Sequence, residues 1–223
     1  MGLQYRAAAL AGIATQFAWG FLEILVFRSF YRAEPEMFPM TMSATASYVW
    51  MQQAFLALFA TWMMENDIFE TIANGNISYS LCRPIKIYHM WFSQSTATRV
   101  SRAVLRCFPI LIFAAFLPEN YRMAKPASAL HFSLFVITLI LGLLVTVAFS
   151  MLVYILTFYT ISPQGVRIVF TSMVEFFAGA VIPLPFFPAN WQRVLEILPF
   201  ASMQNVALRI YSGSMTAAEM VCF

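Results

Sequence analysis

The chain has 223 residues, of which 61% are hydrophobic and only 10% are charged, with a formal net charge of +3. Soluble domains carry roughly 25% charged residues, so this chain has too little charge to cover a water-exposed surface, and the same shortage excludes a disordered chain. The weak positive charge and the lack of a basic run also exclude a nucleic-acid-binding domain. The composition predicts an all-α integral membrane protein, long enough for five or six spans of about 20 residues.

Two apolar runs predict the first two spans. The first, 7–29, follows Arg6 and contains one acidic residue, Glu23, and the second is predicted at 43–64. The length of the first run and its acidic residue argue against a cleavable signal peptide. A carboxylate inside a bilayer is costly and commonly faces a cavity or a partner, so Glu23 is a candidate pathway residue. The alternative is an ion pair with nearby Arg28.

Residues 65–100 form the main polar segment of the chain. We predict a helical extension as far as Ala73 that ends in a left-handed cap within Asn-Gly-Asn at 74–76. Beyond Pro84, the mixed polar and apolar residues from Ile85 to about Gln94 predict a short helix at the membrane surface. The third span is predicted at 101–117.

The longest uncharged run lies between Lys125 and Arg167. It has no strong turn signal, so we predict one long helix over 129–160. Within it, Gly142, Thr146 and Ser150 recur every four residues, a spacing that favours close packing against another helix.

The fifth span is predicted at 165–182 and carries Glu175, which has no cation within one turn. Glu175 is therefore the second candidate pathway or cation-binding residue, with protonation or a bond to a neighbouring helix as the alternative. Short amphipathic helices over 190–211 are expected to lie in the outer membrane interface. A capping box from Thr216 to Glu219 predicts the start of a sixth span.

No enzyme signature is present in the sequence. The patterns of a phosphate-binding loop, a zinc protease and a serine hydrolase are all missing, and the three cysteines have no metal-site spacing. We therefore predict no catalytic, cofactor-binding or metal-binding residue in this chain.

Four segments resemble parts of a known family. The pattern G-x-I-x-x-x-L-x-R-P from Gly75 to Pro84 resembles the loop between the second and third spans of ABC-2 type transporter permeases, in particular the bacterial drug- and antibiotic-export subfamily. The stretch FFAGAVIPL at 176–184 resembles the fifth span of that subfamily, and the proline-containing segments at 186–188 and 198–200 resemble the region after that span. The order of elements fits over nearly the whole chain.

The resemblance implies a type V exporter-like bundle of six spans, the last cut short here, in a bacterial inner (plasma) membrane with the N-terminus in the cytoplasm. It implies two permease subunits, identical or paralogous, each docked on a separate P-loop ATPase subunit that binds ATP and Mg. It implies export of an amphipathic or drug-like substrate. The family's ATPase-coupling loop would fall here on five residues: Gly75, Ile77, Leu81, Arg83 and Pro84.

Two other functions remain open. An ion- or proton-coupled carrier or channel would use Glu23 and Glu175 and would need no ATPase. A membrane-embedded enzyme is less favoured, because no pair of titratable groups has recognisable catalytic spacing.

Overall fold

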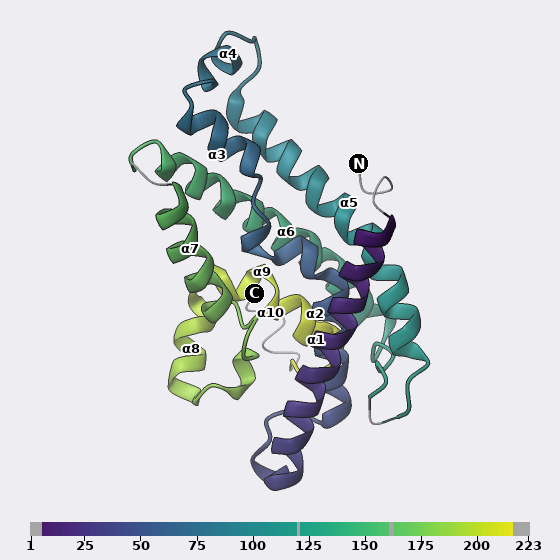
Figure 1. Ribbon diagram of the computed structural model, residues 1–223. Coiled ribbons are helices and arrows are strands. Elements are labelled where there is room, and N and C mark those ends of the chain that lie inside the picture. The colour runs from purple at the N-terminus through teal and green to yellow at the C-terminus, as the bar shows by residue number, and fades with distance from the viewer. Residues whose placement is uncertain (1–5, 120, 161–162, 216–223) are drawn as a thin grey trace.

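The computed structural model describes residues 6–119, 121–160 and 163–215, and the elements of this part of the chain are all helices (Figure 1). The longer helices are α1 (Arg6–Ala33), α2 (Met42–Phe59), α5 (Ile87–Ala115), α6 (Ala129–Thr157) and α7 (Pro163–Phe177). The shorter elements are η1 (Pro35–Met37), η2 (Thr61–Met63), α3 (Asn66–Ala73), α4 (Ile77–Leu81), η3 (Leu184–Phe186), α8 (Ala189–Ile197), α9 (Pro199–Met203) and α10 (Asn205–Ser212).

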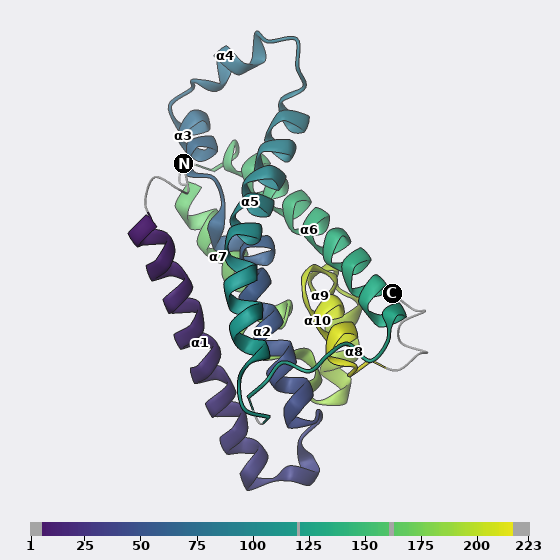
Figure 2. The ribbon, with the colours of Figure 1, turned by 90° about the vertical axis from the view of Figure 1, so that its right-hand side faces the viewer.

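Helix α2 forms the centre of the bundle. It packs against α5, α1 and α10 and also contacts α6, while α1 lies along the outside of α2 and α5 (Figure 2). Trp50 of α2 is fully buried, contacts the rings of Phe17 and Phe21 on α1, and donates its indole N–H to the Tyr121 carbonyl at 2.8 Å. Apolar and aromatic packing around α2 therefore holds the long helices together.

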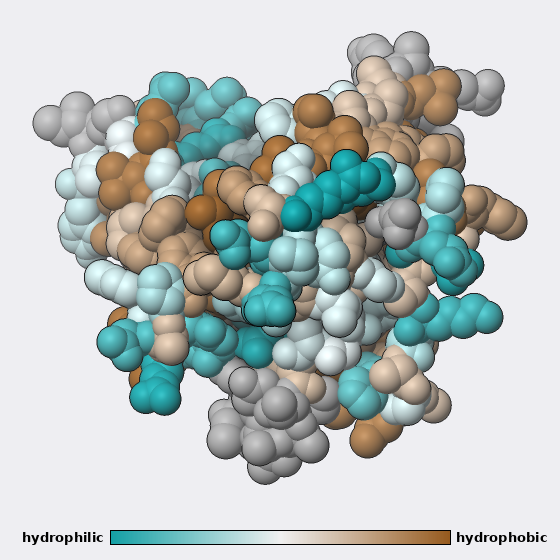
Figure 3. Space-filling view, turned by 90° about the horizontal axis from the view of Figure 1, so that it is seen from below, coloured by the Kyte–Doolittle hydropathy of each residue, from teal (hydrophilic) through white to brown (hydrophobic). Residues whose placement is uncertain are grey.

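Polar residues gather at the two ends of the bundle. One end carries α3, α4 and the α6–α7 connection, and the other carries η1, the 116–128 loop and α8 (Figure 1). Viewed from the second end, hydrophilic side chains are scattered among apolar ones (Figure 3). Exposed charged residues at this end are Arg32, Glu34, Glu36, Glu119, Arg122, Lys125 and Arg193.

The flank between the two ends is apolar and exposed. On α1 it presents Leu10 and Leu25, and on α6 it presents Phe132, Ile137, Ile140, Leu141 and Leu152. Such a band exceeds what a soluble protein exposes and matches a lipid-facing surface. Two helices of the described chain are long and apolar enough to cross a membrane, at 10–33 and 129–157. The remaining predicted spans stay predictions.

The segment after α7 turns back into the bundle. Helices α9 and α10 pack against α6, and residues 205–211 of α10 are all buried. Gly142 allows this approach, because a Cβ placed there would lie 2.2 Å from the Met203 carbonyl oxygen. Thr146 and Ser150 are also fully buried, so the small-residue stripe does face a close neighbour. Helix α10 therefore packs inside the bundle, and the placement of the 190–211 helices in the outer interface stays a prediction.

Several helix ends differ from the sequence prediction. The predicted surface helix and third span form one helix, α5, of 29 residues, about 43 Å long and longer than a bilayer core. Helix α2 ends at Phe59 rather than continuing to 64, and α7 ends at Phe177 rather than at 182. The left-handed cap is present at Gly75, with φ +70°. The capping box at 216–219 lies outside the described residues.

Candidate functional site

A groove of about 1400 Å³ opens along one side of the bundle. Its walls come from α1, from the second half of α2 with η2, from α7, and from the 178–188 segment. The lining is mainly apolar and aromatic, including Trp19, Leu22, Phe27, Phe59 and Phe186. A concave apolar surface with a few polar groups has the usual composition of a ligand site.

Both acidic residues singled out from the sequence line this groove. Glu23 accepts a hydrogen bond through Oε2 from Gln53 Nε2 at 3.4 Å, whereas its Oε1 is buried and has no hydrogen-bond partner among the described residues. Glu175 is half-buried on α7, and Arg167 on the same helix points elsewhere. The structure thus brings together two carboxylates that lie far apart in the sequence.

The expected alternative for Glu23, an ion pair with Arg28, is not formed. The Arg28 guanidinium instead lies over the ring of Tyr121, 4.9 Å from its centroid. The two side chains lie on different faces of α1, because five residues advance a helix by well over one turn. Glu23 therefore has a neutral amide as its partner.

Other polar groups in the groove lack partners and were not singled out from the sequence. Gln16 is only 5% exposed, and neither polar atom of its side-chain amide has a hydrogen-bond partner in the described chain. Gln52 donates to the Ala180 carbonyl at 2.8 Å, but its Oε1 is buried without a partner. Thr61 Oγ1 and Gln204 Nε2 are likewise buried without a hydrogen-bond partner among the described residues. Buried polar atoms are normally paired, so this concentration marks the groove as a candidate ligand site.

The five residues of the predicted coupling loop lie together at the far end of the molecule. Helix α4, from Ile77 to Leu81, projects beyond the bundle, with Gly75 before it and Arg83 and Pro84 after it (Figure 2). Ile77 is half-buried and the other four residues are exposed. Apolar side chains at the tip are largely uncovered, with Tyr79 76% and Leu81 66% exposed.

A buried polar cluster connects this projecting loop to the groove. Arg99 of α5 is fully buried, and its Nη1 donates to the carbonyls of Leu58 (3.2 Å) and Ala60 (2.8 Å) at the end of α2. Its Nη2 donates to Ser150 Oγ on α6 at 3.2 Å. The guanidinium replaces the helical hydrogen bonds that α2 loses where it ends. Arg99 thereby explains why α2 stops here without a glycine or proline.

Glu65 extends the same cluster into the start of α3. Its Oε2 accepts hydrogen bonds from Tyr154 (2.6 Å) and Ser95 (3.0 Å), and its backbone N–H donates to the Tyr154 hydroxyl at 2.9 Å. Next to it, Arg167 of α7 donates to Asn66 Oδ1 and to the Trp62 carbonyl, both at 2.6 Å. The first turn of α3 is thus fixed to α5, α6 and α7 together.

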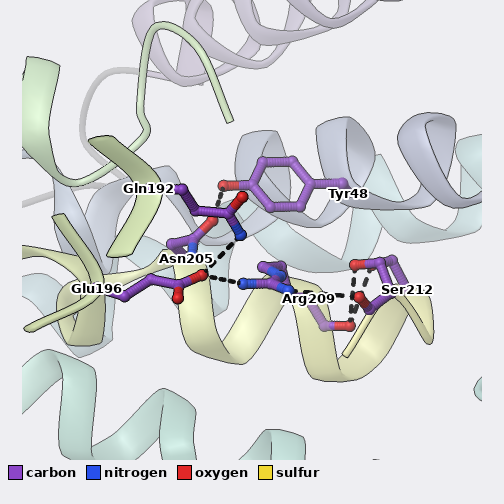
Figure 4. A network of polar contacts seen from close by, with 7 residues as sticks. Tyr48, Gln192, Glu196, Asn205, Arg209 and Ser212 are labelled. Atoms are coloured by element: carbon purple, nitrogen blue, oxygen red, sulfur yellow. Dashed lines mark hydrogen bonds and ion pairs between the residues drawn. The ribbon is translucent and has the colours of Figure 1, made fainter. Parts of the chain in front are cut away.

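A second polar network holds the inward-turning segment in place (Figure 4). Arg209 of α10 is almost fully buried and forms a 2.6 Å ion pair with Glu196 of α8, which also accepts from Gln192 at 2.9 Å. The Tyr48 hydroxyl of α2 lies 3.3 Å from Asn205 Oδ1. These contacts tie α8 and α10 to each other and to α2 behind the groove wall.

The fold and its apolar flank define a helical integral membrane protein with a laterally open groove. Residues 17–223 match the sequence profile of a family described as ABC-2 family transporter protein. The chain belongs to this family and is thus a membrane subunit of the ABC-transporter type. No curated protein and no solved structure gives a significant match.

Proposed function

We propose that this chain is the membrane-spanning permease of an exporter that is driven by ATP hydrolysis in a separate P-loop subunit. The observation that carries the proposal is the connection between the projecting α3–α4 loop and the groove. The tip exposes apolar side chains to which another protein could bind, and the base of the loop is fixed by Glu65 to helices α5 and α6. Arg99 of α5 then holds the end of α2, whose residues line the groove.

This connection provides a path for mechanical work. A push on α4 is transmitted through α3 to the polar cluster, because hydrogen bonds from Ser95 of α5, Tyr154 of α6 and Arg167 of α7 leave the first turn of α3 little freedom. The cluster contains the last carbonyls of α2, so its movement shifts one wall of the groove. ATP and Mg would be held by the partner ATPase, since this chain has no phosphate-binding loop of its own.

The open groove supports a second permease subunit, because a second copy or a paralogue facing it would enclose the path. The start of α1, α4 and the end of α6 share one end of the bundle (Figure 1). That end would face the cytoplasm of a bacterium, where the ATPase is found, and the substrate would leave at the end that carries η1 and α8.

The docking assignment is tested by reversing the charge at the tip. Arg83→Glu is expected to reduce at least tenfold the amount of P-loop ATPase that co-purifies with the tagged full-length protein in mild detergent. The reason is that a glutamate at this exposed position would repel the ATPase surface that the arginine attracts. Leu81→Asp should act similarly by removing apolar contact. Quantitative mass spectrometry of the retained proteins gives the readout.

Arg193→Glu is the matched control. Arg193 is exposed on α8 at the opposite end of the bundle, so the same change in charge there should leave ATPase association intact. If no P-loop ATPase accompanies the wild-type protein at any detergent strength, the proposed function is wrong. If one accompanies both Arg83→Glu and Leu81→Asp at wild-type levels, the docking loop is misassigned.

The ion-coupled alternative is favoured by one observation, the position of Glu23 and Glu175 in the same groove. In that case proteoliposomes without any ATPase would show a pH-driven flux that Glu175→Gln abolishes. The exporter proposal expects no such flux without ATP.

A further inference from the structure

We propose that the groove binds an amphipathic organic cation, with the Glu23 carboxylate as its counter-ion. This inference rests on the proposed function, because it takes the groove to be the transport path. It goes further by naming the charge and character of the substrate and the residue that selects it.

The charges along the groove favour a cation at its centre. The acidic residues that line it are Glu23, Glu34 and Glu175, and Arg106 is the cation in its lining among the described residues. The Arg106 guanidinium lies beside Gly12, 3.3 Å from where a Cβ on that glycine would stand. Gly12 and Glu23 are about 16 Å apart along α1 at 1.5 Å per residue, too far for Arg106 to neutralise Glu23.

Glu23 itself has the geometry of a counter-ion without a cation. It lies midway along the stretch of α1 that lines the groove, and Gln53 occupies only its Oε2. Its Oε1 is left without a partner in the described chain. The Coulomb attraction between a carboxylate and an opposite charge is stronger in an apolar setting than in water, and this favours a cationic ligand at Glu23.

The rest of the lining fits the body of such a ligand. Aromatic side chains such as Trp19, Phe27 and Phe186 provide apolar contact and ring faces that attract a positive charge. The buried and unpartnered amide groups of Gln16 and Gln52 provide additional hydrogen-bonding positions within the groove. A bulky apolar molecule with one positive charge and a few polar groups would match the Glu23 carboxylate, the aromatic lining and the unpartnered amides together.

A bare metal ion fits less well. A hard divalent cation needs six or more oxygen ligands, or several carboxylates together. No group of three or more metal-ligating side chains occurs among the residues that the structure describes. The volume of about 1400 Å³ also suits an organic molecule rather than an ion.

The test is equilibrium binding to the purified full-length protein in nanodiscs, without ATPase. Three probes of similar shape differ in charge: tetraphenylphosphonium, triphenylphosphine oxide and tetraphenylborate. Wild-type protein is expected to bind tetraphenylphosphonium saturably and at least tenfold more tightly than either other probe. Glu23→Gln, which keeps the size of the side chain and removes its charge, should weaken tetraphenylphosphonium binding at least tenfold, and Glu23→Asp should weaken it less.

Glu36→Gln is the control, because Glu36 is exposed in η1 and does not line the groove. It should bind tetraphenylphosphonium as the wild type does. Equal binding of the cation and the anion by wild-type protein, or unchanged cation binding by Glu23→Gln, overturns the inference. The probe comparison uses wild-type protein only, so it tests the preference of the groove for a cation even if a variant fails to fold.

Failure of this inference can be distinguished from failure of the proposed function. If the P-loop ATPase co-purifies but the groove does not discriminate between the probes, the permease assignment stands and the substrate class is wrong. If cation binding is present but no ATPase associates, the binding site stands and the energy source is wrong.

Discussion

Gly142→Ala is expected to destabilise the protein by about 3 kcal/mol, the upper part of the range for overpacking a well-packed core. The new methyl group would lie 2.2 Å from the Met203 carbonyl oxygen and 2.9 Å from that of Ser202. Both atoms belong to the backbone, so no side chain can rotate away. Helices α9 and α10 would have to move off α6, which would loosen the wall that carries Gln204.

The measurement is the thermal midpoint of the purified protein in detergent, compared at one scan rate because membrane proteins commonly unfold irreversibly. The expected loss is about 6–12 °C for a chain of this size. Gly165→Ala is the matched control: a Cβ at this helical position meets no atom within 4 Å, so the midpoint should stay the same or rise slightly. Equal midpoints for Gly142→Ala and the wild type would show that α6 and α9 do not approach as closely as described.

The sequence predicted best those helices that a long uncharged run defines. Helix α6 spans 129–157 against a predicted 129–160, and α1 spans 6–33 against 7–29. In both cases the hydrophobic effect acts on a continuous stretch, so composition alone locates the element. The small-residue stripe was also visible, since glycine, threonine and serine at every fourth position leave one helix face free for a close neighbour.

The errors arose where the outcome depends on a contact between distant residues. Helix α2 ends at Phe59 because Arg99, some forty positions later, binds its final carbonyls. The segment that forms α10 is amphipathic and too short and polar for a span, yet it packs inside the bundle, where Glu196 pairs with Arg209 and allows this charge to be buried. No local pattern predicts such partners, and a buried arginine without its partner would be too costly to expect.

The same limit applies to the candidate site. Glu23 and Glu175 were found from the sequence, because an acidic residue inside an apolar run is conspicuous. That they line one groove required the packing of α1 and α7 around α2. The sequence does not mark Gln16 and Gln52, because a neutral amide costs less free energy in an apolar helix than a charge does. Only the structure shows that polar atoms of these two side chains are buried without a hydrogen-bond partner.

The cluster around Arg99 leads to the second large expected effect. Arg99→Leu should destabilise the protein by about 3–5 kcal/mol, the range found when one member of a buried ionic network is removed. Leucine leaves the Leu58 carbonyl without its guanidinium donor and leaves the Ala60 carbonyl with only the Met63 N–H, at 3.3 Å. It also leaves Glu65 without the buried positive charge with which it interacts electrostatically. Loss of about 6–20 °C in the thermal midpoint is expected.

Arg102→Leu provides the control, because Arg102 lies one turn further along α5 and is exposed. It should change the midpoint by a few degrees at most. Arg99→Lys separates charge from geometry: lysine keeps the positive charge but lacks the planar fork that reaches two carbonyls and Ser150 at once. If charge alone mattered, Arg99→Lys would match the wild type. If the planar guanidinium geometry matters, Arg99→Lys should lose much of the stability of the wild type. In a reconstituted complex, ATP hydrolysis by Arg99→Lys should continue but transport should fall, because α4 would then move without moving the end of α2.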